Sequence, residues 1–186
     1  MRRIATSLPG VLLIEPTVFT DARGFFYESY NKLKFADIGI QDEFVQDNHS
    51  RSARGTLRGL HYQMDHPQTK LCRVVSGTVL DAVADIRSGS PSFGKCLSTI
   101  LSADNKAMIY IPAGFAHGFL VLSDTAEFLY KCDDFYDPAA ERGIVWNDPD
   151  LGIDWGIDMP ILSNKDKLHP RLSEIPPELL PKYEVD

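Results

Sequence analysis

Two histidines that close short polar motifs are the first candidates for chemistry in this chain of 186 residues. Five residues separate Gly55 from His61, and His117 ends the segment Pro112-Ala-Gly-Phe-Ala-His. An imidazole exchanges a proton near neutral pH and therefore suits a general acid or base. A transition metal generally needs three or more N, O or S protein ligands, and only these two histidines are good candidates. We therefore expect no catalytic metal and two histidines that are free for proton transfer.

The bulk composition excludes several classes of protein. The net charge is −7, whereas a nucleic-acid-binding protein needs a basic face. A local arginine cluster can still bind a phosphorylated small molecule. No apolar run approaches the roughly 18 residues of a membrane span, and the run at 11–14 is too short for a signal peptide, so we expect a cytoplasmic protein. The three cysteines have no metal-ligand spacing and are expected to be reduced and packed.

Short strand patterns separated by turn residues dominate the chain and predict a single all-β domain over 1–186. The predicted strands cover 24–30, 44–46, 56–63, 70–75, 78–87, 95–101, 107–111, 118–122 and 126–132. In 78–87 the apolar residues at 80, 82, 84 and 86 fall on one face and the charged residues at 81, 85 and 87 on the other, which is typical of a half-buried strand. Many short strands indicate a sandwich, jelly roll or barrel.

Helical patterns are few and short. One helix is expected at 31–37, ended by Gly39, and one turn at 163–167. The core is expected to span about 8–166. The proline-rich tail at 167–186 is expected to be a surface extension with little regular structure.

The strand at 56–63 contains a conflict of parity. Arg58 and His61 fall on opposite faces of a regular strand, so both cannot face one cavity. Gly59 lies between them, and glycine commonly hosts a β-bulge. We predict irregular pairing at Gly59.

The two histidine motifs resemble the two motifs of the cupins, which implies a double-stranded β-helix, or jelly roll, with both motifs facing one cavity. Metal-binding cupins carry another histidine two residues after the first, where this chain has Gln63. Five blocks also closely resemble the dTDP-4-dehydrorhamnose 3,5-epimerases, and the resemblance covers about 8–166. These blocks are FVQDNHS at 44–50, LRGLHYQ at 57–63, IPAGFAHGF at 111–119, EFLYK at 127–131 and ILSNKD at 161–166.

The resemblance implies an epimerase that needs no cofactor. A base removes the protons beside the ketone of a dTDP-keto-sugar, a donor stabilises the enolate oxygen, and an acid returns a proton. By family match, His61 is the base, Asp166 orients it, Tyr130 is the acid and Lys70 stabilises the enolate. Spacing alone favours a helix capping box for 163–166, a strand tyrosine for Tyr130 and a solvated lysine for Lys70. The family match reverses these interpretations.

The resemblance also implies a set of substrate contacts. They are Arg23, Glu28, Gln46, Asp47, Asn48, Arg58, Gln63, His117, Glu141 and Lys165, with Phe26 and Tyr136 as aromatic residues that stack on thymine. Members of the family form homodimers that exchange N-terminal strands, so Arg23 and Phe26 are expected to serve the neighbour's site. Two closer alternatives stay open: a related dTDP-keto-sugar mono-epimerase and a ketoisomerase. Two remoter ones are a metal-dependent cupin oxygenase and a non-catalytic sugar-nucleotide-binding module.

Overall fold

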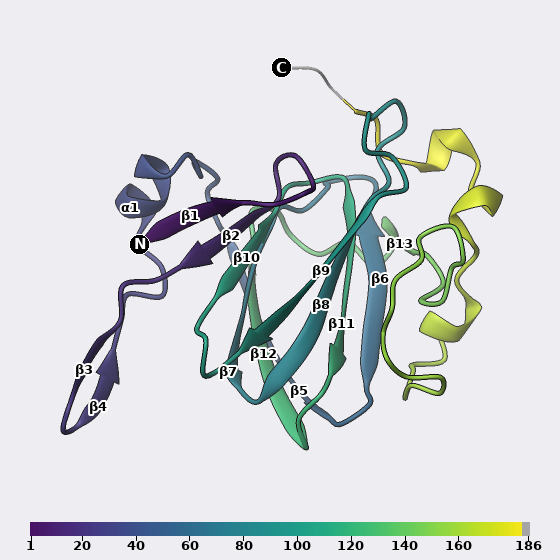
Figure 1. The fold of residues 1–186 in the computed structure, drawn as a ribbon. Helices are drawn as coiled ribbons and strands as arrows, with labels where there is room; N and C mark the ends of the chain where they lie inside the picture. The colour runs from purple at the N-terminus through teal and green to yellow at the C-terminus, as the bar shows by residue number, and fades with distance from the viewer. Residues whose placement is uncertain (184–186) are drawn as a thin grey trace.

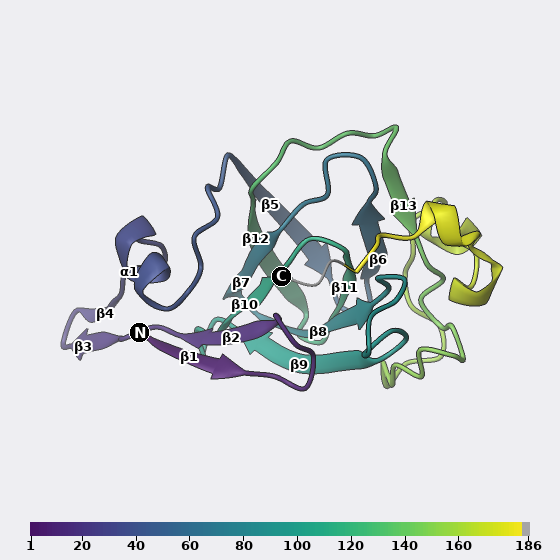
Figure 2. The ribbon, with the colours of Figure 1, turned by 90° about the horizontal axis from the view of Figure 1, so that it is seen from above.

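The computed structural model describes residues 1–183, and two antiparallel sheets form most of it (Figure 1). The six-stranded sheet contains, in spatial order, β1 (Arg2–Ala5), β2 (Leu12–Glu15), β10 (Met108–Ile111), β7 (Lys70–Ser76), β12 (Thr125–Cys132) and β5 (Gln46–Ala53). The five-stranded sheet contains β13 (Glu141–Gly143), β6 (Leu57–Gln63), β11 (Phe115–Val121), β8 (Thr78–Asp85) and β9 (Cys96–Ser102). The view from above shows the two sheets as separate layers (Figure 2). The prediction of an all-β jelly roll with a few short helices is confirmed.

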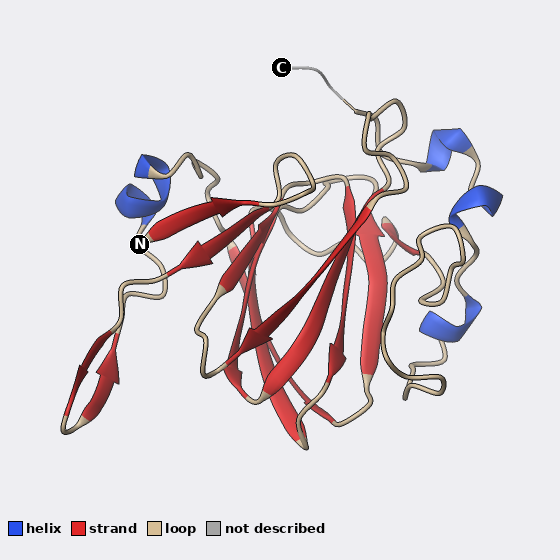
Figure 3. Cartoon of the chain, viewed as in Figure 1, coloured by secondary structure: helices blue, strands red, loops and turns tan. Residues whose placement is uncertain are grey.

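A short hairpin and a few single turns complete the chain. The hairpin of β3 (Phe19–Asp21) and β4 (Gly24–Phe26) projects away from both sheets (Figure 1). Helix α1 (Lys32–Asp37) begins where predicted, because the Asn31 side chain accepts hydrogen bonds from two backbone amides of its first turn. Three 3₁₀ turns, η1 (Asp166–Leu168), η2 (Leu172–Glu174) and η3 (Pro177–Leu179), lie beside β6 and β13 (Figure 3). None of the helices within residues 1–183 combines the length and apolar character needed to cross a bilayer.

Strand β8 is buried on both faces, and the prediction of a half-buried strand was wrong. Ala82 and Ala84 pack in a cluster with Leu172 and Trp155 on the outer side of the five-stranded sheet. On the other face Val79 and Val83 join the cluster that contains residues of both sheets. Asp81 lies on that inner face, fully buried. Its charge suggested an exposed face, but one of its carboxylate oxygens instead forms a hydrogen bond with the buried His117.

The C-terminal segment covers the outer face of the five-stranded sheet. Leu172, Ile175 and Leu180 are buried there, and the Tyr62 hydroxyl donates a hydrogen bond to the Leu179 carbonyl at 3.1 Å. The spacing of these apolar residues follows no helical or strand period, so the sequence pattern did not indicate their burial. The division into a core at about 8–166 and an extension at 167–186 stays a prediction.

Strand β5 is longer than expected. We predicted a strand at 44–46, whereas β5 runs from Gln46 to Ala53. Its residues QDNHSRSA are nearly all polar, and exposed and partly buried positions alternate along most of the strand. An apolar pattern could not reveal this strand, because its inward side chains line a polar cavity.

The predicted irregularity at Gly59 is confirmed. His117 of β11 pairs with His61, but Phe119 pairs with Arg58, so two residues of β6 oppose Gly118 alone. Gly59 has a φ of 115°, and a Cβ there would lie 2.6 Å from the Gly118 Cα atom. The bulge brings Arg58 and His61 to the same cavity.

Candidate active site

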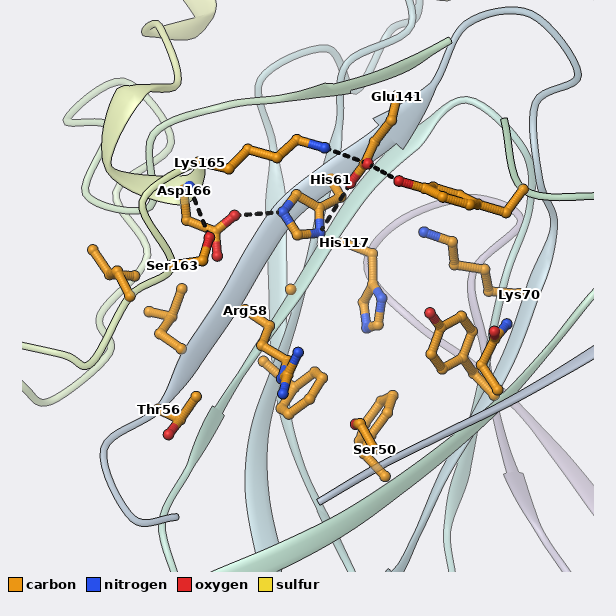
Figure 4. Close-up of a pocket in the computed structure, with 18 of the residues that line it drawn as sticks. Ser50, Thr56, Arg58, His61, Lys70, His117, Glu141, Ser163, Lys165 and Asp166 are labelled. Atoms are coloured by element: carbon orange, nitrogen blue, oxygen red, sulfur yellow. Dashed lines mark hydrogen bonds and ion pairs between the residues drawn. The ribbon is translucent and has the colours of Figure 1, made fainter. Parts of the chain in front are cut away.

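A cavity of about 650 Å³ lies among strands of both sheets and the segment at 161–166 (Figure 4). It is lined by all four predicted catalytic residues and by seven of the predicted substrate contacts. These are His61, Tyr130, Asp166, Lys70, Gln46, Asn48, Arg58, His117, Tyr136, Glu141 and Lys165. Strands β5, β6, β7, β11, β12 and β13 and the turn η1 supply nine of them, and Tyr136 and Lys165 come from the segments between these elements, so residues far apart in sequence meet in one place.

His61 and Asp166 form the shortest polar contact between the catalytic candidates. The Nε2 atom of His61 lies 2.6 Å from Asp166 Oδ1, and Asp166 is 3% exposed. The Asp166 backbone N–H donates to Ser163 Oγ at 3.1 Å, so the Ser163 cap and the carboxylate–imidazole pair coexist. An ionised carboxylate favours the tautomer with the proton on Nε2, which leaves the lone pair of His61 on Nδ1.

The charge state of Asp166 is set by its neighbours. Burial opposes ionisation, but the nearby His169 ring and the hydrogen bond with His61 hold the pKa of Asp166 well below its ordinary value. Asp166 is therefore ionised at neutral pH and can stabilise a protonated imidazole. His169 was not among the predicted site residues.

Glu141 lies on the other side of the His61 ring. Its Oε1 atom is 3.9 Å from His61 Nδ1, while Oε2 accepts hydrogen bonds from the Tyr136 hydroxyl at 2.5 Å and from the Lys165 ammonium. Although burial favours the neutral acid, these two donors lower the pKa of Glu141. The bond to Glu141 in turn raises the pKa of Tyr136 to about 12. Protonated His61 would thus lie between two carboxylates.

Tyr130 and Lys70 come from the sheet opposite His61. Burial raises the pKa of Tyr130 to about 12, an effect that the nearby Arg58 guanidinium partly offsets. The phenol is therefore protonated at neutral pH and able to donate. Lys70 opposes Cys132 on β12, two residues from Tyr130, and makes no salt bridge with any residue from 1 to 183. Its ammonium is available to a ligand in the cavity.

His117 forms a second buried histidine–carboxylate pair. Its Nε2 atom lies 2.9 Å from Asp81 Oδ2, and both residues are buried. The other Asp81 oxygen has no hydrogen-bond partner among the described residues. His117 pairs directly with His61 across the two strands. The carboxylate of Asp81, which the sequence did not identify as a site residue, fixes the ring of His117 in the cavity wall.

Five predicted contacts lie outside this cavity. Arg23 and Phe26 are on the projecting hairpin, and Glu28 pairs with Lys34 beside it. Asp47 lies outside because β5 alternates, and it accepts a hydrogen bond from Lys131 at 2.8 Å. The buried Gln63 side chain bonds to backbone groups of Phe135 and Asp137, an arrangement that holds the neighbouring loop.

Some cavity residues escaped the sequence analysis. Ser50 shares the inward face of β5 with Gln46 and Asn48, so the period of two identifies it once the strand is known. Phe119 and Phe128 stack with their ring centroids 4.1 Å apart and form an apolar wall. Gln68 comes from a loop, where no period could have indicated it.

One group of side chains resembles a metal site by proximity. His61, Asp166 and His169 offer one ligand atom each within 4.8 Å of one another. Zinc bonds of about 2.0–2.1 Å would place the ligand atoms of a tetrahedral site roughly 3.3 Å apart. The 2.6 Å between His61 and Asp166 is shorter than this and fits a shared proton. We therefore interpret the group as a hydrogen-bonded cluster.

Comparisons with known proteins agree with this arrangement. The family model for dTDP-4-dehydrorhamnose 3,5-epimerase matches residues 5–174. A dTDP-4-dehydrorhamnose 3,5-epimerase of Pseudomonas aeruginosa is 57% identical over 169 residues, which cover 90% of this chain and 93% of that protein. A crystal structure of the epimerase of Legionella pneumophila, in complex with dTDP-4-keto-L-rhamnose, is 48% identical with a TM-score of 0.96 and covers 99% of each chain.

A relative with a different specificity is also similar. The 3′-monoepimerase ChmJ of Streptomyces bikiniensis, in complex with dTDP-quinovose, is 36% identical with a TM-score of 0.88, over 96% of this chain and 92% of that one. The likeness to this enzyme is weaker than the likeness to the Pseudomonas and Legionella enzymes. On the extent and identity of these matches, the chain belongs to the dTDP-4-dehydrorhamnose 3,5-epimerase family.

Proposed function

We propose that the protein epimerises carbons 3 and 5 of dTDP-4-dehydro-6-deoxy-D-glucose and yields dTDP-4-dehydro-L-rhamnose without a cofactor. The observation that carries this proposal is the placement of an imidazole–carboxylate pair and a phenol on opposite sheets of one cavity. Epimerisation needs a base on one face of the sugar ring and an acid on the other, since a proton must leave and return on different sides.

The chemistry begins with His61. The ketone at carbon 4 acidifies the hydrogens on carbons 3 and 5, and the lone pair on Nδ1 removes one of them. The C–H electrons move into the carbonyl and form an enolate oxygen, which the Lys70 ammonium stabilises. Asp166 compensates the positive charge that develops on the His61 ring.

Reprotonation comes from the opposite wall. The Tyr130 hydroxyl donates its proton to the carbon from the face that His61 does not reach, and the enolate electrons return to carbon to form the new C–H bond. The configuration at that carbon is thereby inverted. The resulting phenolate is favoured by the nearby Arg58 guanidinium and regains a proton from solvent.

Binding of the nucleotide needs cations and flat surfaces. We assign Arg58 and Lys165 to anionic groups of the substrate and Tyr136 to the base, because all three line the cavity.

Arg23 and Phe26 lie on the projecting hairpin, where Phe19, Phe25 and Phe26 are 61–67% exposed. We propose that this hairpin docks on a second copy of the chain and completes the neighbour's cavity. The cytoplasmic location and the independence from metal and cofactor stay predictions.

Solvent exchange tests this function. The purified protein is incubated with dTDP-4-keto-6-deoxyglucose in heavy water, and the product is analysed by NMR. Deuterium at both carbon 3 and carbon 5 is the expected result. Label at one carbon only would instead indicate a mono-epimerase, and dTDP binding without any label would indicate a binding module. Elemental analysis of the same sample tests for a stoichiometric metal, whose loss together with activity would favour an oxygenase.

A further inference from the structure

A second histidine reaches the carboxylate that orients the proposed base. The His169 Nε2 atom lies 3.5 Å from Asp166 Oδ1, the same oxygen that is 2.6 Å from His61. The His169 side chain is 10% exposed, and its Nε2 atom has no hydrogen-bond partner at ordinary distance among the described residues. The two imidazole rings meet edge to face, with centroids 5.7 Å apart. One carboxylate oxygen is therefore shared by two imidazoles.

The backbone holds His169 in this place. Gly143 of β13 pairs with His61, and a Cβ on Gly143 would lie 2.4 Å from His169 Nε2. The ring thus lies directly against a glycine that leaves room for it. The next residue, Pro170, accepts a hydrogen bond from the Val145 backbone at 2.9 Å, which ties the C-terminal segment to the residues that follow β13.

We propose that His169 is a positioning residue of the proton-transfer pair, which shares the Asp166 carboxylate and weakens its hold on protonated His61. The proposal rests on the function proposed above. A carboxylate oxygen that also attracts a second imidazole N–H has less charge to offer to the first donor. When His169 is itself protonated, repulsion between two imidazolium rings acts in the same direction. Both effects weaken the stabilisation of protonated His61 by Asp166 and so favour the neutral ring that acts as a base.

The other charged groups around His169 do not oppose its proposed effect on protonated His61. A pocket of about 210 Å³ beside it is lined by Tyr62, Glu141, Arg142 and Glu174. One Glu141 oxygen is occupied by Lys165 and Tyr136, and Glu174 accepts a hydrogen bond from the Arg171 backbone at 2.9 Å. The Arg142 guanidinium donates to two backbone carbonyls of its own strand region. Asp166 is thus the carboxylate that His169 shares with His61.

The test compares two variants of the full-length protein. H169F keeps an aromatic ring and removes the donor, whereas H169Q returns an amide donor at a position similar to that of Nε2. The pH dependence of kcat/KM is measured for both, together with the NMR titration of the His61 ring in the ligand-free protein. H169F is expected to shift the acidic limb and the His61 titration to higher pH by roughly one unit, and H169Q to restore most of the shift.

The outcomes separate this inference from the proposed function. If H169F and H169Q reduce kcat equally while neither the acidic limb nor the His61 titration moves, His169 is only structural and the inference is overturned. A titration that moves to lower pH would overturn it as well. If the wild-type protein catalyses no exchange at the sugar, the proposed function fails, whereas the NMR titration still tests His169. Thermal melting and dTDP affinity show whether each variant is folded.

Discussion

Replacing Asp166 by Asn tests the role of the imidazole–carboxylate pair with little change in volume. The carboxylate lies 2.6 Å from His61 Nε2 and is almost fully buried. Unit charges with centres roughly 4 Å apart attract by about 4 kcal/mol at an effective dielectric constant of 20. If about half of the proton charge has reached His61 in the transition state, the loss is about 2 kcal/mol, or roughly 30-fold in kcat.

A change in the tautomer of His61 would add to the loss of activity in Asp166→Asn. An amide at 166 can donate to Nε2, which would move the imidazole proton to Nδ1 and remove the lone pair that faces the substrate. The combined loss is expected to be about 10²- to 10⁴-fold in kcat. Deuterium incorporation at carbons 3 and 5, followed by NMR over time, measures it directly.

A matched control exists on the surface. Asp134 contacts His66 Nδ1 at 3.2 Å in an exposed loop, so Asp134→Asn makes the same chemical change at another histidine–aspartate pair. This variant is expected to retain wild-type activity, because exposed pairs contribute little. An Asp166→Asn protein that stays folded and exchanges deuterium within threefold of the wild-type rate would refute the assignment of Asp166.

Three other substitutions probe the acid, the bulge and a buried ion pair. Tyr130→Phe is expected to slow product formation by about 10²- to 10⁴-fold and to slow proton abstraction less. The substrate should therefore take up deuterium faster than product forms. Equal loss of deuterium uptake and product formation, together with lost dTDP affinity, would show damage to the pocket instead. Gly59→Ala places a Cβ 2.6 Å from backbone atoms and is expected to lower the free energy of unfolding. The loss should exceed that of the control Gly94→Ala, because Gly94 has a φ of 75° but a Cβ there meets nothing within 4 Å. Similar urea midpoints for the two variants would contradict the close packing of the bulge. Asp85 is buried, yet bonds from Arg87, Ser90 and Ser92 lower its pKa to about 2. It therefore stabilises the fold by about 2 kcal/mol above pH 4, and this contribution is lost as the pH falls towards 2. Urea unfolding at pH 7 and pH 2 should show a deficit of about 2 kcal/mol for Asp85→Asn at the higher pH only.

Local sequence patterns predicted the elements that have one apolar and one polar side. The N-cap at Asn31 and most inner strands follow from residue types, and the parity conflict between Arg58 and His61 correctly located the bulge. The polar strand β5 was largely missed, because its inward residues contact the cavity rather than an apolar core. Strands β1 and β2 at the edge of the larger sheet were also missed, and β1 is mostly exposed.

The candidate site was found mainly through family resemblance. Spacing alone favoured a cap for Ser163–Asp166, and the structure contains that cap together with the bond to His61. Asp81 escaped notice because its partner His117 lies 36 positions away on another strand, and local periodicity cannot reveal such a contact. His169 lies only three positions after Asp166, so the turn at 166–168 was a local signal that could have identified it.

The placement of the sugar ring is the most direct test of the account. A crystal structure with a dTDP-4-keto-sugar bound is expected to show carbons 3 and 5 between His61 Nδ1 and the Tyr130 hydroxyl, with the ketone oxygen directed at Lys70. If both side chains lay on one face of the ring, or if an ion occupied the space between them, no inversion through His61 and Tyr130 could take place.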